Sequence, residues 1–518
     1  MRVSSVLSVL PLAGLGALAL LAGPLGAQGY RVELDGRVQG VSYRGWHLDS
    51  IPADQVQLRD GQLYTPDGIG VTCLAGQPYC LYYGPGDKIQ AFPFVATADF
   101  AVWNLGVRGL RIEGSARLAM DGKDGPTLGA STGEPLGAWP GTKPLAQLIE
   151  GYLAYDGPWY ALRGGRLTSV SRFGYTGFDG AQVRVAEPRQ RVGLSGRFGW
   201  ALARSALVPW TDGSLNPLAE YRPGTRDRIW GLDLDWNLPW LSGRVLYERE
   251  WASEDDVTTV SSELLGGDAR VRLHRAVHVS GGLEYDMALG SIGNADGAVT
   301  AMLPRRYGTV SVGARRYRPR FPLWSIWTAF SPVPSTAVFG QAAVQVVAPV
   351  QVRARLERFA YDETDASAPL TVLETDGWRY GLGATYRHSP TLNATVDYRA
   401  GLGPGAQSLT VDAGVNWHPA ERLRLRASGA FVERVLELRT SDNTLWQVGV
   451  DADATVRPGL RAFGGAWYLA ETRDRADAAA FDWNQMRFHL GVRLGVGSAA
   501  DRPTLPPAIL RIPEGGAR

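Results

Sequence analysis

The chain has 518 residues, of which 45% are hydrophobic and 20% are charged, and its formal net charge is +2. This near balance of charge argues against a nucleic-acid-binding protein. After the first 25 residues no run of about 18 apolar residues occurs, which excludes a helical membrane protein.

Residues 1–27 have the three parts of a secretory signal. Arg2 supplies the positive start, the stretch from Val6 to Leu21 forms the apolar middle, and Leu25-Gly26-Ala27 is a small-residue cleavage site. No cysteine follows that site, so a lipoprotein is not expected. We therefore expect an exported chain that begins near Gln28.

The region after the signal is dominated by alternation of apolar and polar residues. From Leu392 to Ala400, every second residue is apolar or aromatic and the residues between them are polar. Because successive side chains of a strand point to opposite faces, such a segment has one apolar face and one charged face. Apolar side chains toward lipid and polar side chains toward a lumen are typical of a transmembrane β-barrel.

Segments of this kind recur almost to the C-terminus. Those of the last third have the roughly 9–11 residues that a tilted strand needs to cross a bilayer. We expect an all-β protein, a single large antiparallel transmembrane β-barrel of about 22 strands (20–22) without a separate plug domain. The strands are expected near residues 30–38, 92–103, 110–118, 146–155, 158–172, 181–187, 190–203, 230–237, 241–253, 262–274, 277–287, 296–303, 307–318, 336–346, 350–361, 378–387, 392–400, 408–417, 422–434, 446–455, 460–471 and 486–496.

Short links alternate with longer polar links, and this alternation predicts the orientation of the barrel. Tight links such as 389–390 and 458–459 are expected at the periplasm, because short turns of these barrels face that side. The barrel is expected to span 28–497. The longest loop, 45–91, is expected outside the cell, and the Pro-containing tail 498–518 is expected in the periplasm.

The only two cysteines, Cys73 and Cys80, lie in the expected loop and bracket Leu-Ala-Gly-Gln-Pro-Tyr. An isolated pair in an exported protein is expected to form a disulfide. A metal site would need further ligands nearby, and the sequence offers none.

A short stretch resembles a known family. Arg163-Gly164-Gly165-Arg166 is followed by Gly174-Tyr175-Thr176-Gly177-Phe178-Asp179-Gly180-Ala181. This pattern resembles a segment of outer-membrane porins, including the alginate-export type, and the resemblance implies a channel-forming barrel. One departure is that such porins usually finish on an aromatic residue, whereas the last expected strand here ends at Val496-Gly497 and a tail follows.

Charged residues gather on the faces that would line the lumen. One interpretation is a basic ladder that attracts anions. The other is that charges in a wet lumen pair across strands, with little gain from each pair. Three like charges on one strand face, Arg422, Arg424 and Arg426, are the strongest candidates for contacts with a solute. The full set of expected pore-lining residues is Arg353, Arg355, Arg379, Arg387, Asp397, Arg399, Asp412, Arg422, Arg424, Arg426, Asp451, Asp453, Arg487 and Arg493.

These features predict a channel in the lipids of a Gram-negative outer membrane, for passive passage of small polar or anionic solutes. A second interpretation is a sheath around a partner protein, such as an electron-conduit cytochrome, in the lumen or at the periplasm. An enzyme in the barrel wall is a third interpretation, but only His489 of the six histidines faces the expected lumen and no serine nucleophile stands beside it. No haem-attachment motif, phosphate-binding loop or metal-spaced Cys/His cluster occurs, so no cofactor is expected.

Overall fold

The fold is that of a computed structural model, which describes residues 27–59, 61–121, 145–187, 191–202, 227–254, 257–304, 307–318, 320, 333–362, 375–403, 407–435, 442–474 and 482–498. The expected signal, apart from Ala27, and the expected tail, apart from Ser498, lie outside the described residues.

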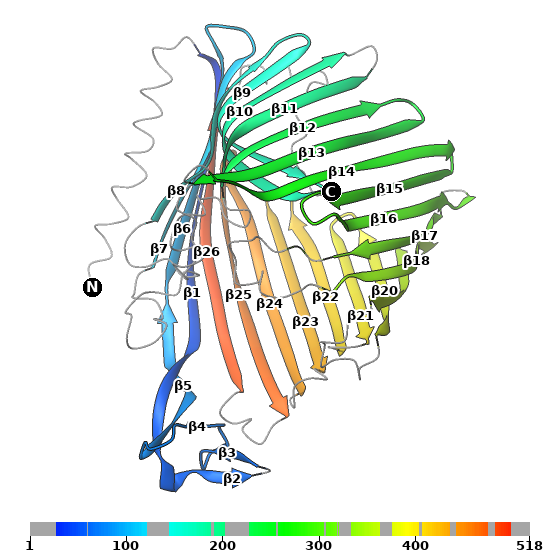
Figure 1. The fold of residues 1–518 in the computed structure, drawn as a ribbon. Coiled ribbons are helices and arrows are strands. Elements are labelled where there is room, and N and C mark those ends of the chain that lie inside the picture. The colour runs from blue at the N-terminus through cyan, green and yellow to red at the C-terminus, as the bar shows by residue number, and fades with distance from the viewer. Residues whose placement is uncertain are drawn as a thin grey trace.

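Antiparallel strands form one closed barrel (Figure 1). The main sheet has 24 strands, and two of them, β4 and β5, belong to an extension, which leaves 22 in the wall. β1 closes the ring because it pairs with β26 along one edge and with β6 along the other. The wall strands are β1 (Ala27–Pro52), β6 (Pro93–Leu105), β7 (Leu110–Asp121), β8 (Leu145–Asp156), β9 (Tyr160–Ser171), β10 (Gly174–Glu187), β11 (Val192–Ala201), β12 (Arg228–Asn237), β13 (Leu241–Glu254), β14 (Val257–His274), β15 (Val277–Asp286), β16 (Ser291–Met302), β17 (Gly308–Tyr317), β18 (Ser335–Val347), β19 (Val350–Tyr361), β20 (Asp376–Ser389), β21 (Leu392–Leu402), β22 (Gln407–Ala420), β23 (Leu423–Val435), β24 (Asp442–Arg457), β25 (Leu460–Asp474) and β26 (Trp483–Gly497).

The expected fold class is confirmed, and each expected segment coincides with one wall strand. Some boundaries differ. β10 begins at Gly174 rather than near residue 181, because Gly174 already pairs with Ser171 across the tight β9–β10 connection. The end of the barrel with tight links, such as 157–159, 275–276 and 458–459, is called the turn end here, and the opposite end is called the loop end.

The segment 45–91, expected as a loop, connects the wall strands β1 and β6, but most of it is strand rather than irregular chain. β1 continues to Pro52 and pairs with β5 (Tyr79–Ala91), so a two-stranded extension projects beyond the loop end (Figure 1). Pairing between two stretches so far apart in the sequence cannot be inferred from either stretch alone. The tip of the extension consists of the 3-10 helix η1 (Ala53–Gln55), the hairpin of β2 (Gln57–Arg59) and β3 (Gln62–Tyr64), and β4 (Thr72–Cys73).

The expected disulfide is confirmed. Cys73 and Cys80 lie opposite each other where β4 pairs with β5, and their sulfur atoms are bonded. The bond closes the loop between them and so restricts the unfolded chain at the tip of the extension.

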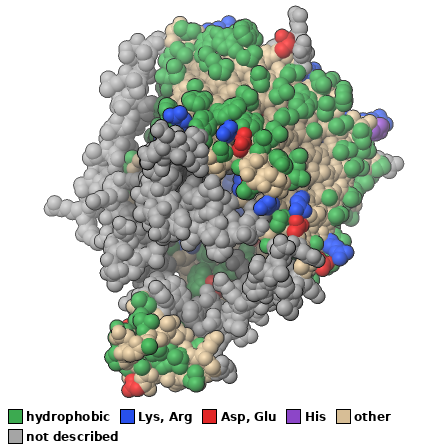
Figure 2. All heavy atoms as spheres, viewed as in Figure 1, with side chains coloured by type: hydrophobic (Ala, Val, Ile, Leu, Met, Phe, Trp, Pro, Cys, Tyr) green, Lys and Arg blue, Asp and Glu red, His purple; other side chains and the backbone are tan. Residues whose placement is uncertain are grey.

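The outer face of the wall is apolar, and Figure 2 shows hydrophobic side chains spread widely over it. Val448 is 57% exposed and Leu490 is 64% exposed, which suits contact with lipid. Exposed tryptophans lie near the strand ends, with Trp378 and Trp446 toward the loop end and Trp417 toward the turn end. This is the arrangement of an interfacial aromatic girdle.

The wall is sharply creased where β9, β10 and β11 meet. Gly165, Gly180 and Gly199 lie in register next to one another. Gly165 has a φ of +139°, and a Cβ there would lie 2.3 Å from the carbonyl oxygen of Gly151. A Cβ on Gly180 would lie 2.1 Å from the carbonyl oxygen of Phe198. Only glycine permits this approach, so the loop-end halves of β9 and β10 turn into the barrel.

Candidate functional site: the charged lumen wall

The inner face of β17–β20 carries three arginines around one buried carboxylate. Glu357 of β19 is 1% exposed. It accepts hydrogen bonds from Arg315 of β17 at 2.5 Å, from Arg355 at 2.7 Å and from Arg379 of β20 at 2.6 Å. One carboxylate cannot neutralise three guanidinium groups, so this part of the wall retains positive charge.

Aromatic rings and neighbouring ion pairs hold the cluster in place. The guanidinium of Arg379 lies 4.0 Å from the ring centre of Phe359, a cation–π contact. Toward the turn end, Arg353 pairs with Asp397 of β21 at 2.9 Å across the glycine at position 383 of β20. A Cβ on Gly383 would lie 2.2 Å from the Asp397 carboxylate, so the missing side chain makes room for this pair.

These groups surround a pocket of about 730 Å³ on the lumen wall. The side chains of Arg353, Arg355 and Arg379 are 41 to 44% exposed and that of Arg399 is 67% exposed, so all four are open to a solute. Of the expected pore-lining residues, this pocket brings together Arg353, Arg355, Arg379, Asp397 and Arg399.

A second pocket, of about 430 Å³, lies nearer the turn end. Asp451 accepts a hydrogen bond from the Trp467 indole at 3.2 Å, and its carboxylate lies 3.6 Å from Nε2 of His489. Arg424 and Arg426 stand opposite Asp453 and Asp451 in register, yet neither arginine forms an ion pair within the described part of the chain. Of the expected residues, this pocket is lined by Arg424, Arg426, Asp451, Asp453 and Arg493.

The remaining expected residues are more scattered. Asp412 pairs with Arg399 at 2.7 Å. Arg487 donates a hydrogen bond to Gln485. Arg387 is exposed near the turn end of β20, and Arg422 lies in the tight link before β23; neither lines one of the two pockets.

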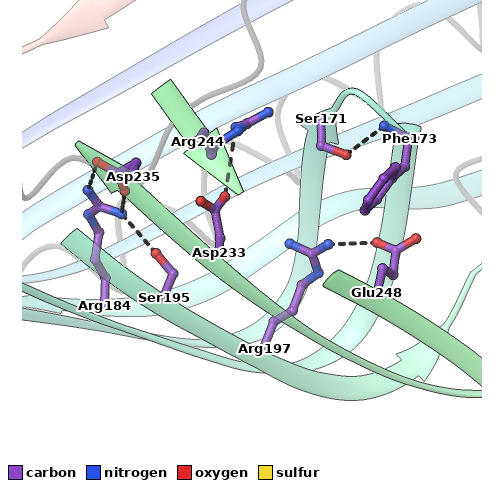
Figure 3. Close-up of polar contacts among 9 residues, drawn as sticks. All are labelled: Ser171, Phe173, Arg184, Ser195, Arg197, Asp233, Asp235, Arg244 and Glu248. Carbon is purple, nitrogen blue, oxygen red and sulfur yellow. Dashed lines mark hydrogen bonds and ion pairs between the residues drawn. The ribbon is translucent and has the colours of Figure 1, made fainter. Parts of the chain in front are cut away.

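The inner face of β10–β13 differs, because its charged side chains are buried and paired with each other (Figure 3). Arg184 is 1% exposed and donates hydrogen bonds to both oxygens of Asp235, at 2.6 and 2.9 Å. Arg197 and Glu248 are also buried and pair at 2.6 Å. Burying a charged side chain is strongly unfavourable unless it is paired in this way. These pairs therefore stabilise the wall, and a solute cannot reach them.

The tip of the β9–β10 hairpin reaches the far inner wall. Phe173 packs with Leu246 of β13 and Leu264 of β14, and its ring lies over Gly266, where a Cβ would come within 2.7 Å of it. Arg172 donates to Asp268 of β14 at 2.8 Å and also to a carboxylate of β16. The hairpin therefore crosses the inner faces of β11 and β12 and is anchored on β13–β16.

Replacing Phe173 with Ala should loosen this anchor. The side chain is 5% exposed, and truncation of a buried phenylalanine costs about 3–5 kcal/mol of unfolding free energy. We expect a lower urea midpoint together with larger fluctuations of the open-channel current, because the hairpin tip lies in the lumen. Val448→Ala, on the lipid-facing side, is the control and should leave current fluctuations unchanged; equal fluctuations in both variants would contradict the placement of the tip.

Sequence reasoning missed the buried ion pairs and the anchor residues. Arg184, Arg197, Asp233 and Glu248 alternate with apolar residues along their strands just as Arg353 and Arg355 do, so the signal was present. Arg172 and Phe173 gave no signal, because they lie in a two-residue connection whose contacts are made with distant strands.

Within the described ranges, no group of three or more His, Cys, Asp or Glu residues could hold a metal ion, and no helix is long and apolar enough to cross a membrane. A closed barrel with an apolar exterior and a charged interior defines the class: an outer-membrane β-barrel protein of porin-like architecture.

The chain matches no family model, and no curated protein matches it in sequence. Among solved structures, it is similar to OccAB4 of Acinetobacter baumannii, with a TM-score of 0.39, 7% identity and coverage of 92% of this chain and 100% of that chain. It is also similar to a mutant of the ferric enterobactin receptor PfeA of Pseudomonas aeruginosa, with a TM-score of 0.47, 9% identity and coverage of 89% and 80%. Such likenesses concern general barrel shape and leave the resemblance to alginate-export porins untested.

Proposed function

We propose that this protein is a channel that passes small polar solutes across the outer membrane and favours anions. The supporting observation is the excess of arginine on the accessible inner face of β17–β24. Around Glu357, three arginines share one carboxylate, and farther along the wall Arg424 and Arg426 lack ion-pair partners among the described residues. Arginine on a pore wall attracts anions and repels cations.

The proposed orientation places the turn end in the periplasm. Short connections of bacterial barrels face the periplasm and longer ones face outward. The β1–β5 extension and its disulfide would then stand outside the cell, and Gly497, the last residue of β26, would lie at the periplasmic side.

The proposal is tested by ion selectivity in planar bilayers. We expect the purified protein to conduct and to show a reversal potential that favours chloride over potassium in a salt gradient. Arg422→Gln/Arg424→Gln/Arg426→Gln should lower the anion-to-cation permeability ratio while the barrel still assembles, because no lipid contact changes. The effect should weaken in salt of about 1 M, where the Debye length is about 3 Å.

Arg358→Gln is the control, because Arg358 lies on the outer face beside Trp378 and pairs with Asp376. It should leave the reversal potential unchanged. A protein without measurable conductance would contradict the channel, and copurification of a lumenal protein would then favour the sheath. Unaltered selectivity in a conducting triple variant would mean that these arginines do not act on the permeating ions.

A further inference from the structure

The inward turn of the β9–β10 hairpin leaves a seam in the barrel wall. β8 pairs with β9 only over Gly151–Asp156 and Ala161–Arg166, although residues 145–156 and 160–171 are all described. β8 nevertheless continues along β7 as far as Leu145, and β9 continues along β10 as far as Ser171. The edges 145–150 and 167–171 therefore face each other without a backbone ladder between them.

The seam begins at the glycine crease. Gly165 is next to Arg166, the last residue of β9 that pairs with β8, and its left-handed φ directs the following residues into the barrel. The anchor of Phe173 between Leu246 and Leu264 then holds the hairpin away from β8. The crease at Gly165 and the anchor at Phe173 thus keep the loop-end half of β9 apart from β8.

Two side-chain hydrogen bonds bridge the seam in place of a ladder. Arg166 donates from Nη1 to the carbonyl oxygen of Leu148 at 2.8 Å, and Thr168 donates from its hydroxyl to Glu150 at 3.0 Å. Lipid tails cannot satisfy unpaired edge groups, whose exposure to hydrocarbon costs several kcal/mol each. Another molecule with a polar group can replace these two side-chain hydrogen bonds. The backbone hydrogen bonds of β7–β8 and β9–β10 would stay intact.

Two donors without partners in the described part of the chain belong to residues beside the seam, Arg163 in the paired part of β9 and Tyr175 of β10. The Nε of Arg163 and the hydroxyl of Tyr175 are both buried and have no hydrogen-bond partner among the described residues. Two unsatisfied buried donors beside a weakly bridged gap suit an acceptor that enters from outside.

The surroundings of the seam are apolar toward the bilayer. On the outer face, Leu148 and Leu153 of β8 are 45% and 49% exposed, and Leu162 of β9 is 40% exposed. A molecule at the seam would therefore meet hydrocarbon on one side and hydrogen-bond donors on the other.

We propose that the β8–β9 seam is a lateral port through which single-chain amphiphiles with an anionic head pass between the lumen and the bilayer. The head would accept hydrogen bonds from Arg163, Arg166 and Tyr175 and displace the Arg166–Leu148 bridge, while the acyl chain lies among the leucines outside. This port is a route in addition to passage along the barrel axis.

The first test locks the seam. Glu150→Cys/Thr168→Cys places two thiols where the native side chains touch, and both native cysteines are already bonded to each other. The thiols are bridged with a short reducible bifunctional reagent in the full-length protein. Ala384→Cys/Val396→Cys, an opposed outer-face pair of the fully laddered β20–β21 interface, is the matched control.

The readout is single-channel current with laurate dissolved in the bilayer lipid. In the native protein and in the unbridged variant, we expect laurate to reduce the conductance to about half or less, because an anionic chain entering from the side obstructs the pore. Bridging across the seam should abolish the reduction without changing the conductance in laurate-free lipid, and reducing the bridge should restore it. Equal reduction in bridged and unbridged protein, or none in the native protein, would overturn the port.

A second measurement needs no variant and no conductance, so its failure can be told apart from failure of the channel proposal. A photoreactive C12 carboxylic acid is dissolved in liposomes that contain the native protein, and the labelled peptides are mapped. The port predicts labels within 145–150 and 163–176, including inward-facing residues. Labels confined to the outward-facing residues of all strands alike would overturn it.

Discussion

Replacing Glu357 with Gln is expected to lower the free energy of unfolding by about 3 kcal/mol or more, because it removes the negative charge that three arginines share. Arg315, Arg355 and Arg379 all donate to this carboxylate, which is 1% exposed. The amide that replaces it has the same shape but no charge, and it can accept only through one oxygen. The urea midpoint of the barrel in detergent measures the loss.

The same substitution should increase anion selectivity in the barrels that do assemble, because it adds net positive charge to the wall of the larger pocket. Asp412→Asn is the matched control. Its pair with Arg399 has side chains that are 40% and 67% exposed, and exposed pairs contribute at most about 1 kcal/mol. Equal shifts in the urea midpoint for the two variants would show that Glu357 is as well solvated as Asp412, which would contradict the buried hub.

Replacing Gly165 with Val is expected to prevent correct closure of the barrel or to cost about 3 kcal/mol or more. The Cβ of a side chain here would lie 2.3 Å from the carbonyl oxygen of Gly151. In addition, β-branched residues do not readily adopt a φ of +139°. Backbone strain of this kind costs about 1–3 kcal/mol, and a forced backbone shift adds to it. Heat-modified mobility on gels and the urea midpoint report assembly and stability.

Gly164→Val is the control, because a Cβ at Gly164 meets nothing within 4 Å. This neighbour lies on the opposite face of the same strand, so it tests the same change in β propensity without the clash. If both variants assemble equally well, the crease does not depend on the glycine at position 165, and the seam between β8 and β9 loses its structural cause.

The sequence by itself determined the architecture of the wall. Apolar side chains must meet lipid and polar side chains must meet the lumen, so each strand carries a period of two that can be read locally. Segments such as 392–400 and 486–496 therefore predict β21 and β26, and the short links between segments predict an antiparallel meander. The sequence also predicts the disulfide, because Cys80 is the only other cysteine with which Cys73 could pair.

Only the tertiary structure decided which polar faces are open to a solute. Arg184 and Arg353 occupy equivalent places in the alternating pattern, yet Arg184 is 1% exposed and the side chain of Arg353 is 44% exposed. Arg184 is enclosed against Ser195 and Asp235 of the neighbouring strands, and the crease at Gly165 brings Phe173 onto the inner faces of β13 and β14. Period-two alternation specifies the face of a strand but not the curvature of the sheet, and contacts between strands far apart in the sequence set that curvature.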